Sequence, residues 1–262
     1  MFFSKKQNES FSLSDALYGE TAIDFHSHIL PEMDDGCQSC DEAIEILCAT
    51  YSQGIGKIVA TPHFYPTEED PQTFFKRRDI ALEKLISAIE ESRIDKSRLP
   101  SVCVGAEVAY FNGIANCADV NKLCICGTNL LLLELPFSEW GESIIDEIHY
   151  LQRRQEVVPV IAHIERYVTL QKKQVIEALM SSDLLIQSNA SGFLNLSSRG
   201  FALRELKCGC IDILGSDAHN LTGRAQALGQ AMSFIEKKLG KKVIDEIIRF
   251  GNYILNDAEW VI

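Results

Sequence analysis

Residues 22–36 read AIDFHSHILPEMDDG, an apolar stretch that ends in two histidines and two adjacent aspartates. This stretch predicts a strand over Ala22–Ile29. Side chains alternate between the two faces of a strand, so His26 and His28 point to the same side near its carboxyl end. That spacing is typical of two ligands of one metal ion. Two histidines bonded to backbone groups would have the same spacing, so the pair alone does not establish a metal site.

Short apolar runs alternate with segments of helical period along the chain. Strands are predicted at Ala22–Ile29, Lys57–Thr61, Val102–Val108, Leu130–Leu135, Val158–His163, Leu184–Asn189 and Ile211–Ser216. Helices are predicted at Asp41–Gln53, Pro71–Ser92, Ser143–Arg154, Lys173–Met180, Ser198–Lys207, Gly223–Lys238 and Lys242–Phe250, with Asp41 as the first N-cap. This alternation, uninterrupted by a linker, predicts one α/β domain, which is either a (β/α) barrel or a doubly wound sheet.

The composition is that of an ordinary globular domain. The 262 residues are 46% hydrophobic and 24% charged, and their number fits a single α/β barrel. A formal net charge of −12 repels phosphate backbones and argues against nucleic-acid binding. No apolar run approaches the roughly 20 residues that a membrane-spanning helix needs, so no membrane insertion is expected.

The nine cysteines favour free thiols in a reducing cytoplasm, because their number is odd and the first residues lack a secretory signal. Cys37 and Cys40 form the one CxxC pair, whereas structural zinc sites favour two such pairs. No cysteine is followed six positions later by an arginine, as a phosphatase with a cysteine nucleophile requires. A cysteine-based phosphatase is therefore excluded.

Five of the six histidines lie at or just past the carboxyl end of a predicted strand. Catalytic residues of parallel α/β folds gather at these ends. The acids Glu107 and Asp217 occupy equivalent positions, and Asp34 and Asp35 follow the first strand. Five imidazoles and at least three carboxylates exceed what one tetrahedral site needs and suit two or three ions of Mn, Fe, Zn or Mg rather than Cu. The sixth histidine, His149, lies on a predicted helix and is expected to be structural or exposed.

Several motifs in combination resemble the PHP (polymerase and histidinol phosphatase) superfamily. The motifs are DFHSHILPEMDDG (24–36), ATPH (60–63), GAE (105–107), AHIERY (162–167) and GSDAHN (215–220). Within the superfamily, the Asp-Asp-Gly after the histidines, Arg166 and Arg224 are similar to the bacterial PHP-type protein-tyrosine phosphatases of capsular and exopolysaccharide biosynthesis, the CpsB type. The resemblance runs from about Thr21 to Arg224. Glu32-Met33 and the Cys37/Cys40 pair depart from the family pattern, but neither removes a ligand.

Residues 1–20 are expected to be a polar N-terminal arm and residues 21–262 a single domain, for which the resemblance implies a distorted seven-stranded (β/α) barrel. The resemblance also implies two or three divalent ions at the barrel mouth, expected to be Mn²⁺, with Fe, Zn, Co or Mg as alternatives. The implied ligands are His26, His28, Glu107 and Asp217 for one ion, Glu107, His63 and His163 for a second, and Asp35 and His219 for a third. Asp35 is preferred to Asp34 because it directly precedes the glycine.

The implied activity is hydrolysis of phosphotyrosine, with an autophosphorylated bacterial tyrosine kinase as substrate. Arg166 and Arg224 would bind the phosphate, although a surface ion pair would also explain each arginine. A water or His219 would protonate the leaving tyrosine. A homo-oligomer formed through the arm or the helix Asp41–Gln53 is an alternative to a monomer.

Two other functions remain open. The same ions would serve a phosphatase of a small phosphomonoester such as histidinol phosphate. A regulatory binding module without turnover would belong to another class, but the complete ligand set argues against it. A nuclease is disfavoured by the acidic charge.

Overall fold

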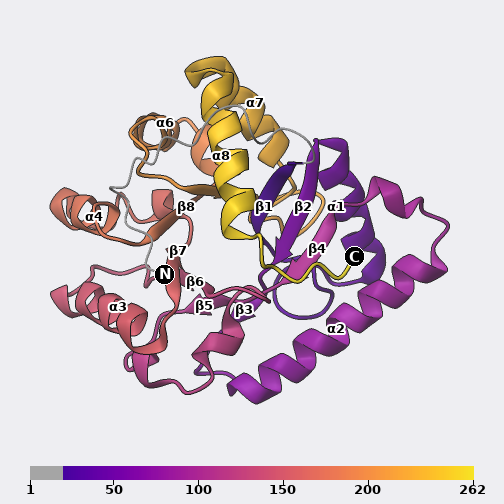
Figure 1. Ribbon diagram of the computed structural model, residues 1–262, viewed down its shortest axis with the longest axis horizontal. Helices are drawn as coiled ribbons and strands as arrows, with labels where there is room; N and C mark the ends of the chain where they lie inside the picture. Colours follow the sequence, from indigo (N-terminus) through magenta and orange to yellow (C-terminus); the bar gives the residue numbers. More distant parts are fainter. Residues whose placement is uncertain (1–19) are drawn as a thin grey trace.

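The computed structural model describes residues 20–262, so residues 1–19 of the predicted arm lie outside the described part (Figure 1). The strands are β1 Ala22–Ser27, β2 Ile55–Ala60, β3 His63–Phe64, β4 Ser101–Val104, β5 Glu107–Ala109, β6 Leu130–Glu134, β7 Val158–Ile161, β8 Leu185–Asn189 and β9 Ile213–Gly215. The α-helices are α1 Cys40–Ser52, α2 Pro71–Glu91, α3 Glu142–Gln155, α4 Lys173–Met180, α5 Ala190–Leu194, α6 Arg199–Lys207, α7 Leu228–Leu239 and α8 Lys241–Ile254. Short 3₁₀ helices are η1 Lys96–Arg98, η2 Ile114–Asn116, η3 Val120–Leu123 and η4 Ile164–Arg166.

The strands form curled parallel sheets. One sheet has the order β1-β2-β4 and the other the order β3-β5-β6-β7-β8-β9. Ser27 at the end of β1 pairs with Ala218 just past β9, so the first strand lies beside the last. At the opposite junction, the Gly105 N–H donates to the carbonyl of Ala60 at 2.8 Å. Because every pairing is parallel, the carboxyl ends of neighbouring strands lie at the same edge.

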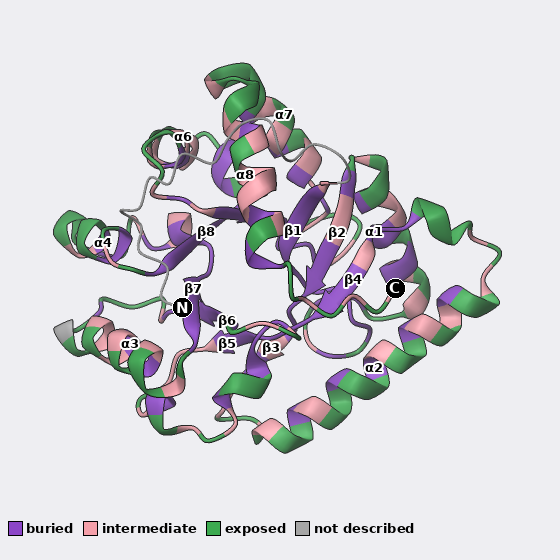
Figure 2. Ribbon diagram, in the orientation of Figure 1, coloured by how far each residue is buried: buried purple, intermediate pink, exposed green. Residues whose placement is uncertain are grey.

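Both faces of the strands are buried, as Figure 2 shows for most of the sheet. In β6, Leu131 and Leu133 join the hydrophobic cluster that includes residues of α1 and α2. Leu130 and Leu132 join a second cluster, which includes Phe25 of β1 and residues of the C-terminal segment. Strands with two buried faces are apolar at successive positions, which explains the unbroken leucine run.

The predicted strand Val102–Val108 is wrong as a single element. It divides into β4 and β5 on either side of Gly105, and the two parts pair in different sheets. A Cβ at Gly105 would lie 3.2 Å from the Ile125 side chain, so a residue larger than glycine would have little space at this break. The two-residue strand β3 also lies just beyond the predicted Lys57–Thr61, and the seven predicted strands become nine in the described residues.

The N-cap of α1 and the start of α7 differ from the prediction. Ser39, not Asp41, is the N-cap of α1, and its Oγ accepts from the Glu42 N–H at 3.2 Å. Helix α7 begins at Leu228 rather than Gly223 because the intervening residues make tertiary hydrogen bonds. In particular, Gln226 Nε2 donates to Asp24 Oδ2 at 2.8 Å. The short helix α5 was not predicted.

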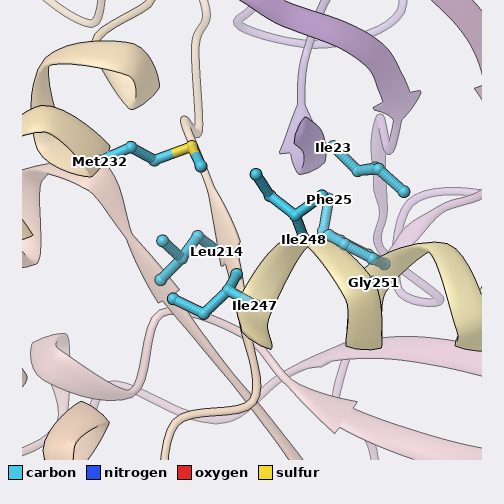
Figure 3. A pocket seen from close by; sticks show the side chains of 7 residues that line it. All are labelled: Ile23, Phe25, Leu214, Met232, Ile247, Ile248 and Gly251. Atoms are coloured by element: carbon cyan, nitrogen blue, oxygen red, sulfur yellow. The ribbon is translucent and has the colours of Figure 1, made fainter. Parts of the chain in front are cut away.

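A small apolar cavity of about 10 Å³ lies where α8 packs on β1 and β9 (Figure 3). Its lining residues are Ile23, Phe25, Leu214, Met232, Ile247, Ile248 and Gly251. Ligand pockets usually measure hundreds of Å³ and include polar groups, so this space is a packing gap. Among residues 20–262, no helix combines the length and the apolar character that a membrane crossing requires.

Candidate metal centre

The two histidines of the first strand meet at its carboxyl end. His26 lies on β1 and His28 directly follows it, and their Nε2 atoms are 3.1 Å apart. Both side chains are fully buried. The alternation of side chains along the strand therefore brings the pair together as predicted.

The loop after His28 separates the roles of the two aspartates. Asp34 Oδ2 lies 2.7 Å from His28 Nδ1 and accepts from the His63 N–H at 2.8 Å, so it orients these residues. Asp35 is 66% exposed, and its Oδ1 lies 3.2 Å from His219 Nε2 and 3.6 Å from His63 Nε2. A Cβ at Gly36 would lie 2.3 Å from the His28 carbonyl oxygen, which explains the glycine of this motif.

Glu107 lies at the middle of the cluster. Its Oε2 is 3.1 Å from His26 Nε2, 3.3 Å from His28 Nε2 and 3.0 Å from His63 Nδ1. Its Oε1 is 2.9 Å from His163 Nε2. Although buried, Oε2 has no hydrogen-bond partner. A buried carboxylate oxygen that faces several imidazole nitrogens without a bond fits a metal-bridging ligand, because such an atom needs a positive partner.

Three groups of side chains in the described residues are close enough to hold a metal ion. They are His28, Asp35, His63 and His219; His26, His28 and Asp217; and His63, Glu107 and Glu134. All members within a group offer ligand atoms within 4.8 Å of one another. His163 adjoins the third group, since its Nε2 is 3.3 Å from Glu134 Oε1. No cysteine belongs to any group, so these groups do not include the Cys37/Cys40 pair.

Sequence reasoning missed Glu134 and Asn189. Glu134 ends β6 and Glu107 begins β5, and both belong to one candidate group with His63. The signal was an acid that closes the apolar run Leu130–Leu133, the same signal that identified Glu107. Asn189 ends β8, and its Nδ2 donates to Asp217 Oδ2 at 2.8 Å.

Both predicted arginines reach the cluster through Asp217. Arg166 Nη2 lies 2.5 Å from Asp217 Oδ2, and Arg224 Nη2 lies 2.8 Å from Asp217 Oδ1. Arg224 Nη1 is also 3.3 Å from Asp35 Oδ2. Each arginine side chain is about one-third exposed, whereas Asp217 is buried. The guanidinium groups therefore line the boundary between the cluster and solvent.

Two cluster residues have a left-handed backbone that non-glycine residues seldom adopt. The φ of His163 is +34° and that of Asp217 is +57°. Such a conformation persists when the surroundings fix it, and it is most common at functional sites. By contrast, His149 lies on α3 and joins none of the described candidate groups.

The buried charges shift one another's pKa. Burial lowers the pKa of His28, but the neighbouring carboxylates of Asp34 and Glu107 outweigh it and raise the pKa to about 10. Burial likewise opposes protonation of His163, whose bonds to Glu107 and Glu134 raise its pKa to about 9. Burial and the charge of His28 lower the pKa of His219 to about 4.

The two central carboxylates stay ionised. Burial raises the pKa of Glu107, but the charge of His26, the hydrogen bond between His163 and Oε1 and the adjacent His28 imidazole hold it well below its usual range. Burial also raises the pKa of Asp217, but the charges of His26 and His28 outweigh it and lower the pKa of this carboxyl. Ionised carboxylates and a neutral His219 are the forms in which these groups bind metal ions.

Comparisons with known proteins agree with this geometry. The family model for capsular polysaccharide synthesis proteins, CpsB/CapC, matches residues 22–255. The tyrosine-protein phosphatase YwqE of Bacillus subtilis is 28% identical over 228 residues, which cover 84% of this chain and 86% of YwqE. The tyrosine-protein phosphatase CpsB of Streptococcus pneumoniae is 26% identical over 86% of this chain and 94% of CpsB.

A similar solved structure supports the same relationship. It comes from a study of YwqE from Bacillus subtilis and CpsB from Streptococcus pneumoniae, described as unique metal-dependent tyrosine phosphatases. The TM-score is 0.75 at 25% identity, and the match covers 91% of this chain and 96% of that one. The chain therefore belongs to the CpsB/CapC family of capsular polysaccharide synthesis proteins.

Proposed function

We propose that this chain is a metal-dependent protein-tyrosine phosphatase whose substrate is a phosphorylated bacterial tyrosine kinase of capsular or exopolysaccharide synthesis. The observation that carries the proposal is the unbonded Oε2 of Glu107 among three imidazole nitrogens. The relatives named as tyrosine-protein phosphatases support the reaction. The kinase substrate follows from the family resemblance, whereas the proposed location in the cytoplasm rests on the nine free cysteines.

The proposed ligands divide into three sets around Glu107. His26, His28, Glu107 and Asp217 would hold one ion, and Glu107 with His63, His163 and Glu134 a second. Asp35 and His219 would complete a third. The donors are nitrogen and oxygen atoms without thiolates, which suits Mn²⁺ as well as Fe, Zn, Co or Mg.

When bound, divalent cations activate water as a nucleophile and neutralise charge on the phosphoryl oxygens. Arg166 and Arg224 would bind the phosphate from the solvent side, where their planar guanidinium groups form paired hydrogen bonds that lysine does not. His219 is proposed both as a ligand and as a proton donor to the leaving tyrosine. Its pKa of about 4 favours the ligand role, because the side chain is neutral at pH 7.

For the fold, we propose a seven-stranded barrel of PHP type in residues 21–262. In this description β2 with β3, and β4 with β5, are single interrupted strands. The Gly105 bond to Ala60 and the Glu107 N–H bond to Pro62 support continuity across the interruptions. The pairing of Ser27 with Ala218 supports closure between the first and last strands.

The test is phosphate release from a phosphotyrosine peptide and from histidinol phosphate, each measured with Mn²⁺ and with a chelator. Metal-dependent release from the peptide alone is the expected result. Asp217→Asn should abolish it, while Asp41→Asn, an exposed acid on α1, should not. Preference for histidinol phosphate would contradict the substrate assignment and leave the metal centre standing. No release from either substrate would favour a non-catalytic binding module.

A further inference from the structure

Phe137 is a half-exposed aromatic residue beside the metal centre. It follows β6, and 51% of its surface is exposed. Its ring lies 5.7 Å from the ring of His163, centroid to centroid, and the planes differ by only 20°. Tyr167 supports the same ring at 5.4 Å. The phenyl ring thus rests on a candidate metal ligand while much of it remains open to solvent.

The loop that carries Phe137 is fixed on both sides of it. The Pro136 carbonyl accepts from Trp140 Nε1 at 2.8 Å. The Ser138 carbonyl accepts from Gln171 Nε2 at 2.7 Å, and Gln171 Oε1 accepts from the Trp140 N–H at 2.9 Å. A ring held in this way loses little conformational freedom when a ligand contacts it, which favours binding.

The position of the ring relative to the charged groups decides its role. His163 Nε2 contacts Glu107 and Glu134, so the His163 imidazole lies between Phe137 and the carboxylates at which the phosphoryl group would be processed. Arg166, a proposed phosphate ligand, lies three residues after His163. In phosphotyrosine, a single ester oxygen joins phosphorus to the ring. The substrate ring must therefore lie next to the groups that surround the phosphoryl site.

We propose that Phe137 determines specificity by stacking against the aromatic ring of the substrate phosphotyrosine; this inference rests on the proposed phosphatase function. Aromatic pairs at such separations gain energy beyond simple burial, and an aliphatic phosphomonoester or free phosphate gains none of it. Tyr65 also stacks on a cluster histidine, His63, at 5.0 Å. However, Tyr65 is surrounded by the acids of the cluster and is less exposed than Phe137.

The experiment compares the wild-type enzyme with Phe137→Ala in Mn²⁺. Loss of the stacking contact should lower kcat/KM for a phosphotyrosine peptide roughly three- to ten-fold, mainly through KM. The inhibition constant of inorganic phosphate, which has no ring, should stay unchanged. Phe137→Trp should restore kcat/KM. Tyr253→Ala is the matched control, because Tyr253 is equally exposed at 51% and its neighbour Asn252 bonds Thr21 at the opposite end of β1.

Two results would overturn the inference while leaving the phosphatase function intact. One is an unchanged kcat/KM in Phe137→Ala. The other is a weaker phosphate inhibition with a loss of bound metal, which would show that the ring only supports His163. Failure of the proposed function appears separately, as absence of phosphotyrosine hydrolysis by the wild-type enzyme, and it would remove the basis of the inference as well.

Discussion

Replacement of Asp34 by Asn should weaken Mn²⁺ binding about 10- to 100-fold. The buried Asp34 carboxylate contacts His28 Nδ1 at 2.7 Å and accepts from the backbone of His63 and Gly36. An amide keeps one acceptor oxygen for a backbone N–H but loses the charged bond to His28, which is worth about 1.5–3 kcal/mol. That free energy corresponds to roughly 10- to 150-fold in affinity. Mutation of a carboxylate that orients a metal-binding histidine typically lowers metal affinity about 10- to 100-fold.

The assay is calorimetric titration of the chelator-treated protein with Mn²⁺, followed by activity at saturating metal. Asp34→Asn should recover most of its kcat when Mn²⁺ is saturating, because no ligand has been removed. Asp35→Asn should stay impaired at saturation, because it removes a proposed ligand. Mn²⁺ affinity of Asp34→Asn within two-fold of wild type would refute the orienting role. If Asp34→Asn kept a low kcat at saturating Mn²⁺ while Asp35→Asn had the wild-type kcat, Asp34 would be the metal ligand and Asp35 the orienting residue.

Three further predictions test the charges and the backbone of the site. Mn²⁺ binding at pH 7 should release protons from His28 and His163, whose pKa values are about 10 and 9. The Mn²⁺ affinity should therefore rise about ten-fold per released proton with each pH unit between pH 7 and 9. Calorimetry in buffers of different ionisation enthalpy measures the number of protons released, and a value of zero would contradict the prediction. Arg224→Ala should raise KM for a phosphotyrosine peptide about ten-fold with little change in bound metal, because it removes a charged phosphate contact; an unchanged KM in steady-state assays would remove Arg224 from the phosphate site. Gly36→Ala should destabilise the protein by about 1–3 kcal/mol in urea unfolding, because the new Cβ would meet the His28 carbonyl at 2.3 Å; wild-type stability would show that the loop relaxes freely.

Local pattern predicts the strands and the residues at their ends, because burial on two faces and side-chain alternation leave a direct trace in sequence. Helix α4 matches its predicted bounds, Lys173–Met180, and β8 differs from its prediction by one residue. The principle that catalytic residues gather at the carboxyl ends of parallel strands also predicts that His26, His28, Glu107 and their partners lie at one edge. Glu134 satisfies the same principle, because it ends β6 after an apolar run.

Features that depend on distant residues could not be predicted from local pattern. The crowding that a Cβ at Gly105 would meet comes from Ile125, and Gln226, just before α7, bonds to Asp24 and Thr50. The separate roles of Asp34 and Asp35 follow only from the fold, which turns one side chain toward His28 and the other toward His219.

The charge balance of the cluster explains why these residues occur together. Buried carboxylates are costly unless positive partners compensate them. In this chain the imidazoles of His26, His28 and His163 and the guanidinium groups at Asp217 provide that compensation, and the pKa values of His28 and His163 are raised in return. A dication attracts each carboxylate more strongly than a proton on a neighbouring imidazole does, because it carries twice the charge. The same arrangement that keeps Glu107 ionised therefore favours exchange of imidazole protons for divalent ions, and proton release on metal binding measures that exchange directly.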